Sequence, residues 1–460
     1  MLKNKIYLLA LLVSLTLLAE AQQVRKVRQA QPNVIIILTD DMGFSDIGTF
    51  GGKFVPTPQI DRLASKGLKL TQYYSAAPIC SPSRVGMLTG MYPGKWNFST
   101  YLDNRKHNRN AEQADYLDPA APTMAKIFKQ AGYATAHFGK WHMGGGRDVK
   151  DAPGFDQYGY DAHASTYESP APDPAITATD WIWSEKDSIK RWDRTKYFVD
   201  KTLDFIRENK GKPCFVNLWP DDVHTPWVPR TEKEYTGKFP MNPQEEAAFK
   251  GVLREYDVQI GRLIEGLKKM GEDKNTIIIF TSDNGPLPSF KGSRAACLRG
   301  SKLSLYEGGT RMPFIISWPG HIPEGKINEK SVVTAIDLLP SLTAMAGIAL
   351  PENYKADGLN RSPVFLGKTV SRDQPVFWEY GRNNIAFNYP NPKDKSPNLA
   401  MRLGDWKFLM NSDGTDSQLY NIVKDSYETT NLVESQGKLA AQLKEKLIAW
   451  WKSMPRLGQQ

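Results

Sequence analysis

The sequence predicts an α/β fold: a large, mostly parallel sheet flanked by helices, followed by a smaller C-terminal subdomain of antiparallel strands and a helix. Continuous β-branched runs, such as residues 34–38 (Val-Ile-Ile-Ile-Leu), are typical of strands buried on both faces of a parallel sheet. Amphipathic helical patterns lie between these runs. From about residue 351 the pattern changes to short strand-like pieces separated by loops rich in Asn, Pro, Asp and Gly, which indicates antiparallel pairing.

Each element of the large sheet is predicted from a local pattern. The expected strands share a short apolar run and cover 34–38, 133–138, 215–219, 276–280 and 313–318. The expected helices are 57–67, which Thr57-Pro58 caps, and 123–132, 198–206 and 247–267. In the C-terminal part we expect strands over 375–380, 399–403 and 406–410 and a helix over 439–451. The predicted domains are therefore a large α/β domain over 22–350 and an α+β subdomain over 351–460.

The first 21 residues are typical of a signal peptide. Lys3 and Lys5 form a basic start, residues 6–18 are apolar, and Ala19-Glu20-Ala21 is a small-x-small cleavage site. The apolar run is too short for a spanning helix, although an N-terminal membrane anchor is the alternative interpretation. No Cys follows the run, which disfavours a lipoprotein. We expect an exported, periplasmic protein without a stable membrane anchor.

The composition excludes several classes of protein. With 40% hydrophobic and 24% charged residues, the chain is neither disordered, collagenous nor fibrous. Three Cys cannot form a multi-disulfide framework. The net charge of +9 suits anionic partners such as acidic glycans, nucleic acid or membrane surfaces, and charge alone does not choose among them.

Polar side chains follow four of the predicted strands, at the sheet edge where open α/β folds gather functional groups. Two clusters contain only oxygen ligands: Asp40 and Asp41 after the first strand, and Asp283 and Asn284 after residues 276–280. Neighbouring buried carboxylates repel unless a cation lies between them. Oxygen ligands favour Ca²⁺ or Mg²⁺, whereas Zn²⁺ needs His or Cys. The alternative is that Asp40 and Asp283 cap helices that follow them.

Basic side chains follow the other two strands. Lys140 and His142 come after residues 133–138, and His224 comes after residues 215–219. A single Lys is usually a solvated surface group, and a single His is usually structural. Their position after buried strands instead favours a place in the same site as the aspartates.

The segment Cys80-Ser81-Pro82-Ser83-Arg84 is the most specific signal in the sequence. Pro82 suits the first turn of a helix, which puts Cys80 at the helix N-terminus, where backbone N–H groups and the helix dipole favour an anion. Arg84 lies one turn further along and can face the same anion. An isolated Cys is more often a small buried hydrophobe, an interpretation that suits Cys214 and Cys297 better than Cys80.

This segment, continued by Leu88-Thr89-Gly90, resembles the maturation signature of the formylglycine-dependent sulfatases of the alkaline phosphatase superfamily, in particular exported bacterial glycan sulfatases. The next position, usually Arg in that family, is Met91. Further family-like stretches occur in order, at 33–43, 139–142, 224–227, 282–285, 298–302, 307–313, 318–320, 404–407 and 419–421. The resemblance thus covers most of the chain.

The resemblance implies a metal site and a modified residue. Asp40, Asp41, Asp283 and Asn284 would hold Ca²⁺, in preference to Mg²⁺. Cys80 would be converted to formylglycine, the nucleophile, by a formylglycine-forming maturation enzyme of the host.

The resemblance also implies roles for the basic residues. Arg84 would stabilise the hydrated aldehyde, and Lys140 and Lys302 would bind the sulfate oxygens. His142 would accept a proton from the second hydroxyl, and His224 would assist the leaving alcohol. Whether His224 or Lys302 is the general acid stays open.

The substrate expected from these observations is a sulfated carbohydrate, attacked from a chain end and including glycosaminoglycan fragments that carry uronic acid. A basic run could bind a carboxylate or a second sulfate, unless it is simply a solvated loop. Its candidate substrate-binding residues, together with one from the C-terminal subdomain, are Arg105, Lys106, His107, Arg109 and Arg382. No nucleic-acid partner is expected. The alternatives are a phosphate or phosphonate monoester hydrolase on the same scaffold and a non-catalytic binder of anionic glycans.

Overall fold

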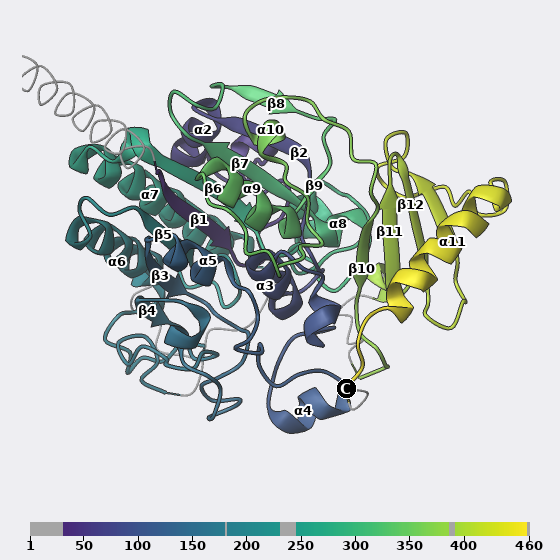
Figure 1. Cartoon of the computed structure of the whole chain (residues 1–460), viewed down its shortest axis with the longest axis horizontal. Helices are drawn as coiled ribbons and strands as arrows, with labels where there is room; N and C mark the ends of the chain where they lie inside the picture. Colours follow the sequence, from purple (N-terminus) through teal and green to yellow (C-terminus); the bar gives the residue numbers. More distant parts are fainter. Residues whose placement is uncertain (1–30, 180–181, 231–244, 386–391, 458–460) are drawn as a thin grey trace, which may run out of the picture.

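The computed structural model describes residues 31–179, 182–230, 245–385 and 392–457 (Figure 1). The predicted signal peptide, residues 1–21, lies outside the described residues. No helix within the described ranges combines the length and apolar character that crossing a membrane requires.

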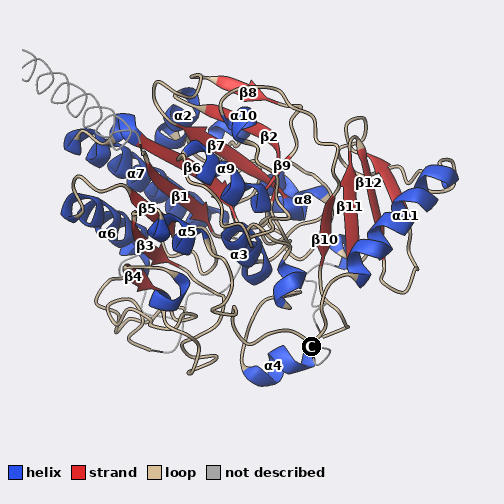
Figure 2. Cartoon of the chain, viewed as in Figure 1, coloured by secondary structure: helices blue, strands red, loops and turns tan. Residues whose placement is uncertain are grey.

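A mixed nine-stranded sheet forms the centre of the larger part of the molecule (Figure 2). In spatial order its strands are β4 (Ala162–Ser165), β3 (Ala134–Gly139), β5 (Cys214–Trp219), β1 (Asn33–Thr39), β6 (Thr276–Ser282), β7 (Arg311–Ser317), β2 (Leu68–Tyr74) and β8 (Lys326–Asn328), with β9 (Val333–Thr334) also paired to β2. The strands from β4 to β6 are parallel, whereas β7 is antiparallel to both β6 and β2. The carboxyl ends of β3, β5, β1 and β6 therefore meet at one edge.

Helices cover both faces of this sheet, which is why its central strands are apolar throughout. On β1, Ile36 faces one hydrophobic cluster and Ile35 faces the other. The helices of the first face are α3 (Cys80–Thr89), α5 (Met124–Gln130), α9 (Leu338–Met345) and α10 (Ser362–Phe365). Those of the second face are α2 (Pro58–Ser65), α6 (Arg194–Glu208) and α7 (Glu246–Met270). The short helices α4 (Arg105–Asn110) and α8 (Glu307–Thr310) lie in connections.

A separate antiparallel sheet and one helix form the C-terminal part (Figure 1). Its elements are β10 (Val376–Glu379), β11 (Leu399–Leu403), β12 (Trp406–Met410), β13 (Gln418–Asn421) and α11 (Gly437–Lys452). Strand residues alternate between two faces. Met401 and Phe408 pack under Leu443 of α11, whereas Ala400 and Leu409 face a cluster that includes Cys80. The small sheet therefore forms part of the surroundings of the predicted site.

The predicted fold class is confirmed, and the differences concern the shorter elements. The strands β2, β4, β8, β9 and β13 were not predicted. Thr57 is the N-cap of α2 and Pro58 lies in its first turn, as predicted, although the Thr57 side chain accepts no hydrogen bond from that helix. Asp257 of α7 accepts the N–H groups of Gln59 and Ile60 instead. The domain boundary between residues 350 and 351 stays a prediction.

Candidate active site

Cys80 is the first residue of α3, a helix in which every residue is buried. Ile79 before it is extended, so the chain enters the helix sharply and presents the thiol at the helix N-terminus. Gly86 permits close packing, since a Cβ there would collide with the side chain of Ala76. Ser83 Oγ donates to the carbonyl of Asp283 over 2.5 Å, which links α3 to the end of β6.

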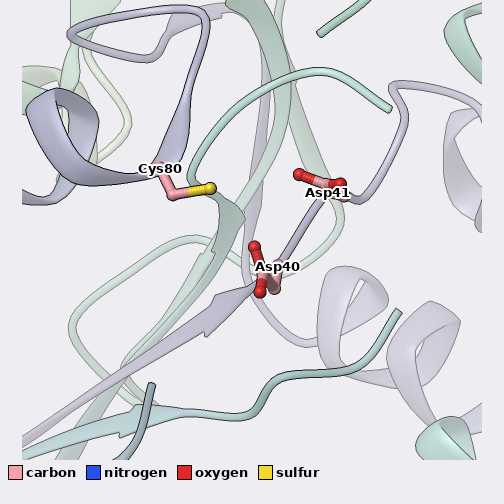
Figure 3. Close-up of side chains that lie close together, drawn as sticks. All are labelled: Asp40, Asp41 and Cys80. Carbon is pink, nitrogen blue, oxygen red and sulfur yellow. The ribbon is translucent and has the colours of Figure 1, made fainter. Parts of the chain in front are cut away.

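The Cys80 thiol points toward two aspartates that follow β1 (Figure 3). One potential ligand atom from each of Asp40, Asp41 and Cys80 lies within 4.8 Å of the others, and all three residues are buried. Burial raises the pKa of the Cys80 thiol to about 11, although Lys140 and Lys302 act in the opposite direction. The segment that follows β1 and the N-terminus of α3 thus meet at one point.

Arg84 ties α3, the helix that begins with Cys80, to the acidic cluster. Its Nη2 and Nε atoms donate to Oδ2 of Asp283 over 2.7 and 3.0 Å, and Nη2 lies 3.4 Å from Oδ1 of Asp40. Its Nη1 atom donates to the backbone carbonyl of Lys140 over 2.8 Å. Burial raises the pKa of Asp283 to about 6. The neighbouring carboxylates of Asp40 and Asp41 also raise it, and the charge of Arg84 acts in the opposite direction.

Lys140, directly after β3, and Lys302, in the connection between β6 and β7, approach the same cluster. Lys140 Nζ donates to Asp40 Oδ2 over 2.8 Å and to Cys80 Sγ over 3.7 Å. Lys302 Nζ lies 2.7 Å from Asp41 Oδ1. Burial acts to lower the pKa of each lysine, but the neighbouring aspartates outweigh it and hold both values above their ordinary range. Gly139 makes the turn before Lys140 with φ of 121°, where a Cβ would collide with the Trp219 carbonyl.

Two histidines lie in the same cavity with different environments. His224 Nδ1 donates to the carbonyl of Thr225 over 2.6 Å, which leaves Nε2 facing Asp41 Oδ2 at 3.6 Å. His142 Nε2 donates to the carbonyl of Leu102 over 3.1 Å, which leaves Nδ1 as the proton-accepting atom, 3.9 Å from Oε1 of Glu168. Burial lowers the pKa of His142 to about 4, although Glu168 acts to raise it. His142 is therefore neutral at pH 7.

The oxygen atoms of the acidic cluster fit a hard cation. Asn284 Nδ2 donates to Asp41 Oδ1 over 2.7 Å, so its own Oδ1 is oriented away from that bond and, like Asp40 Oδ1, is buried without a hydrogen bond in the described structure. A bound cation would satisfy both orphaned oxygens. No helix begins directly after Asp40 or Asp283, so the helix-cap interpretation of these residues is wrong. The donor set suits Ca²⁺ in particular, because it contains neither His nor Cys and Ca²⁺ takes several carboxylate and amide oxygens.

A cavity of about 290 Å³ opens onto this cluster. Five of the residues predicted for the site line it together with Asp40: Cys80, Lys140, His142, His224 and Lys302. Residues that the sequence did not single out also line it: Ile79, Tyr101, Thr166, Tyr167, Glu168, Ile182, Arg191, Leu287 and Leu303. Arg191 is held by Asp221, whose Oδ1 lies 2.8 Å from Nη1. Asp221 follows β5 closely, but no sequence pattern marks its buried partner Arg191.

Family models match nearly all of the described chain. The model described as Sulfatase matches residues 32–348, which include the whole cluster around Cys80. A second model, described as N-sulphoglucosamine sulphohydrolase, C-terminal, matches residues 301–453. This chain belongs to the sulfatase family. It is thus an enzyme that hydrolyses sulfuric esters, and the family predicted from the Cys80 segment is confirmed.

Named relatives of this sulfatase act on sugars. The N-acetylgalactosamine-6-O-sulfatase of Bacteroides thetaiotaomicron is 29% identical, over 97% of this chain and 99% of its own. The human N-acetylgalactosamine-6-sulfatase is 31% identical, over 77% of this chain and 69% of its own. The crystal structure of Ps i-CgsB in complex with k-i-k-neocarrahexaose superposes with a TM-score of 0.73 and 26% identity, covering 91% of this chain and 92% of that one.

The predicted substrate-binding residues of the sulfatase lie apart from the cavity lining. The residues concerned are Arg105, Lys106, His107, Arg109 and Arg382. The first four belong to α4, where Arg105 is paired with Asp115 over 2.9 Å. The side chain of Arg382 is only 2% exposed and faces Glu379.

Proposed function

We propose that this sulfatase hydrolyses sulfate monoesters on glycans, with Cys80 matured to formylglycine and Ca²⁺ held by Asp40, Asp41, Asp283 and Asn284. The observation that carries the proposal is the arrangement around Cys80. The side chain at the N-terminus of α3 meets two lysine ammonium groups and an oxygen-only acidic cluster inside one cavity. A sulfate group placed there would contact a helix N-terminus and cations at once.

Formylglycine at position 80 would supply a hydrated aldehyde, one hydroxyl of which would be the nucleophile toward sulfur. The lysines provide what the reaction needs on the sulfate side. Lys140 Nζ lies 3.7 Å from Cys80 Sγ, and Lys302 reaches the cluster through Asp41. Both ammonium groups are buried, so they stabilise negative charge on the sulfate oxygens more strongly than exposed lysines would. Arg84, fixed by Asp283 and the Lys140 carbonyl, keeps its charge at the nucleophile without needing to move.

Proton transfer is carried out by His142 together with either His224 or Lys302. His142 offers its Nδ1 lone pair, since Nε2 donates to Leu102, and Glu168 lies where it stabilises the protonated ring. The leaving alcohol takes its proton from His224 or from Lys302, both of which line the cavity. The net reaction consumes one water and yields the alcohol and inorganic sulfate.

Several observations support a carbohydrate substrate attacked from a chain end. A cavity of about 290 Å³ is of a size for one sugar unit, and Tyr101 and Tyr167 give it aromatic walls suited to sugar rings. The relatives named above are N-acetylgalactosamine-6-sulfatases, and the solved structure holds k-i-k-neocarrahexaose. Glycosaminoglycan fragments that carry uronic acid are the proposed substrates.

Export and maturation follow from the same proposal. Cys80 is 2% exposed in the folded chain, so a formylglycine-forming enzyme must reach it before folding is complete. This order is compatible with a signal peptide over residues 1–21 and export to the periplasm, where glycan fragments are degraded.

The test uses protein co-expressed with a formylglycine-forming enzyme and checked by mass spectrometry at Cys80. Sulfate release is measured on a panel of heparan, chondroitin, galactan and mucin-type saccharides, each with one sulfate at a known position. Release from at least one saccharide, absent in Cys80→Ala, supports the proposal. Phosphate and phosphonate esters of the same alcohols are assayed in parallel, because three buried cations also suit those anions. Release from these alone, or binding without any turnover, would replace the proposal by one of the two alternatives.

A further inference from the structure

A second cavity lies next to the one that contains Cys80. Its volume is about 510 Å³, and it is formed mainly by the segment that follows Asn284. Leu287 lines both cavities. Ser301 lines the second cavity, and the next residue, Lys302, lines the first. The two cavities are therefore neighbours that share a wall.

Two of the cations that line the second cavity form no ion pair with a carboxylate among the described residues. Lys291 is exposed and Arg299 is half-buried, and within the described residues neither forms an ion pair with a carboxylate. Arg294 differs, since its Nη2 atom lies 2.7 Å from the buried carboxylate of Asp46. One carboxylate, that of Asp394, also lines the cavity and accepts a hydrogen bond from Ser301 Oγ over 3.0 Å. The balance of charge in the cavity is positive.

Among the described residues, Arg299 is held in place by neutral groups. Its Nη1 atom donates to Tyr420 Oη and to the Glu428 carbonyl, each over 2.9 Å. Its guanidinium carbon lies 3.8 Å from the ring centroid of Tyr306. These contacts fix the plane of the guanidinium while leaving Nε and Nη2 without a hydrogen bond to the described residues. A guanidinium oriented in advance in this way loses little side-chain entropy when it binds a planar carboxylate or a sulfate.

We propose that this second cavity is a subsite for an anionic group, a carboxylate or a sulfate, on the sugar linked to the one whose ester enters the Cys80 cavity. The inference rests on the proposed glycan sulfatase function. It identifies the residues that would contact the neighbouring sugar. Lys291 and Arg299 bind the anion, and Leu287 separates it from the ester under attack. The basic residues of α4 do not line either cavity.

The experiment compares kcat/KM for four matched substrates of matured enzyme. All carry the same sulfated sugar: alone, with a neutral neighbour, with a uronic acid neighbour, and with a sulfated neighbour. We expect both anionic neighbours to raise kcat/KM over the neutral one, or one of them alone if the subsite is selective. Lys291→Gln should reduce that advantage about threefold, as for an exposed ion pair. Arg299→Gln should reduce it about tenfold, as for a charge-assisted hydrogen bond.

The control variant is Lys274→Gln. Lys274 is an exposed lysine just before β6, at the opposite end of that strand from Asp283. It should leave all four rates unchanged, and neither subsite variant should alter kcat/KM for the single sugar. Lys291 is exposed, so its variant keeps the test valid even if Arg299→Gln disturbs folding.

Two results would overturn the subsite. One is a wild-type enzyme that turns over neutral and anionic neighbours equally well. The other is a Lys291→Gln variant that retains the full preference. If no sugar sulfate is hydrolysed, the proposed function fails separately. Binding of the same oligosaccharides to Cys80→Ala protein by calorimetry then decides the subsite, and equal affinity for anionic and neutral neighbours rejects it.

Discussion

The guanidinium of Arg84 donates two hydrogen bonds to a single oxygen of Asp283, over 2.7 Å from Nη2 and 3.0 Å from Nε. Both side chains are fully buried, and they join α3, which begins with Cys80, to the carboxyl end of β6. Together with the Ser83 hydrogen bond to the Asp283 carbonyl, the pair fixes where Cys80 lies relative to the acidic cluster. It also keeps a positively charged guanidinium beside the acidic cluster, which an apolar side chain at this position would not do.

Replacing Arg84 by Met should destabilise the protein by about 3–5 kcal/mol, because one partner of a buried ion pair is removed and the other is left uncompensated. The free energy change is measured by denaturant unfolding, and sulfate release should be lost as well. Arg62→Met is the matched control, since Arg62 lies on the exposed side of α2. A loss of stability no larger than that of the control would contradict the structural role given to this pair.

Calcium should stabilise the folded protein. Free Ca²⁺ at one hundred times its dissociation constant should add about 2.7 kcal/mol, which a chelator removes. The readout is the melting temperature with Ca²⁺, Mg²⁺ or chelator. Asn284→Ala removes an orphaned buried oxygen and should abolish the effect, whereas Asn284→Asp retains an oxygen ligand and should preserve it. A melting temperature that does not respond to Ca²⁺ in the wild type would argue against the metal site.

The central strands and the residues after them were predictable because burial on both faces leaves a continuous apolar run. Strand β1 is buried at every position, and Asp40 follows it directly. Strand β2 lies near the sheet margin with a mixed burial pattern, and β4 has only four residues, so neither carries that run. Glu168 follows β4 closely and was missed for the same reason.

The candidate substrate-binding residues were harder to predict, since a local charge pattern does not show whether a helix faces the cavity. The basic run that begins at Arg105 forms α4, and Arg105 is paired with Asp115 over 2.9 Å. Arg299 became a candidate only once its neighbours were known. Tyr306 and Tyr420 hold it from different parts of the fold, and their sequence separation gives no local signal.

A buried carboxyl group between the two sheets should make stability fall as the pH rises. Burial raises the pKa of Glu428 to about 7; Lys407, whose Nζ lies 3.2 Å from Oε1, opposes this, while Glu307 adds to it. The ordinary value is 4.5, so between pH 4.5 and 7 the folded state holds a proton that the unfolded state has released. The stabilisation is therefore complete below pH 4.5 and is lost as the pH rises through 7.

Glu428→Gln removes this titration, because the amide is neutral at every pH. Relative to the wild type, the variant should gain roughly 2–3 kcal/mol between pH 5 and pH 8. The measurement is the unfolding free energy of both proteins at these two values, with Glu434→Gln as an exposed control. A wild type and variant that respond to pH in parallel would show that Glu428 does not titrate in this interval.

The contact between His142 and Glu168 should be visible in the pH dependence of catalysis. His142 Nε2 donates to the Leu102 carbonyl, so only Nδ1, 3.9 Å from the Glu168 carboxylate, can take a proton. Burial, Lys140 and Arg84 lower the pKa of His142 and Glu168 raises it, giving about 4. Removing the negative charge in Glu168→Gln should therefore lower that pKa further and weaken the base.

Two readouts separate this role from simple substrate contact. The acid limb of the plot of kcat against pH should move to lower pH in Glu168→Gln. At pH 7, kcat should fall roughly tenfold, which is less than the whole contribution of a general base. In a His142→Ala background the same substitution should cost almost nothing further, since the two side chains act as one unit. If Glu168→Gln raises KM while the acid limb stays in place, Glu168 binds the sugar and does not support His142.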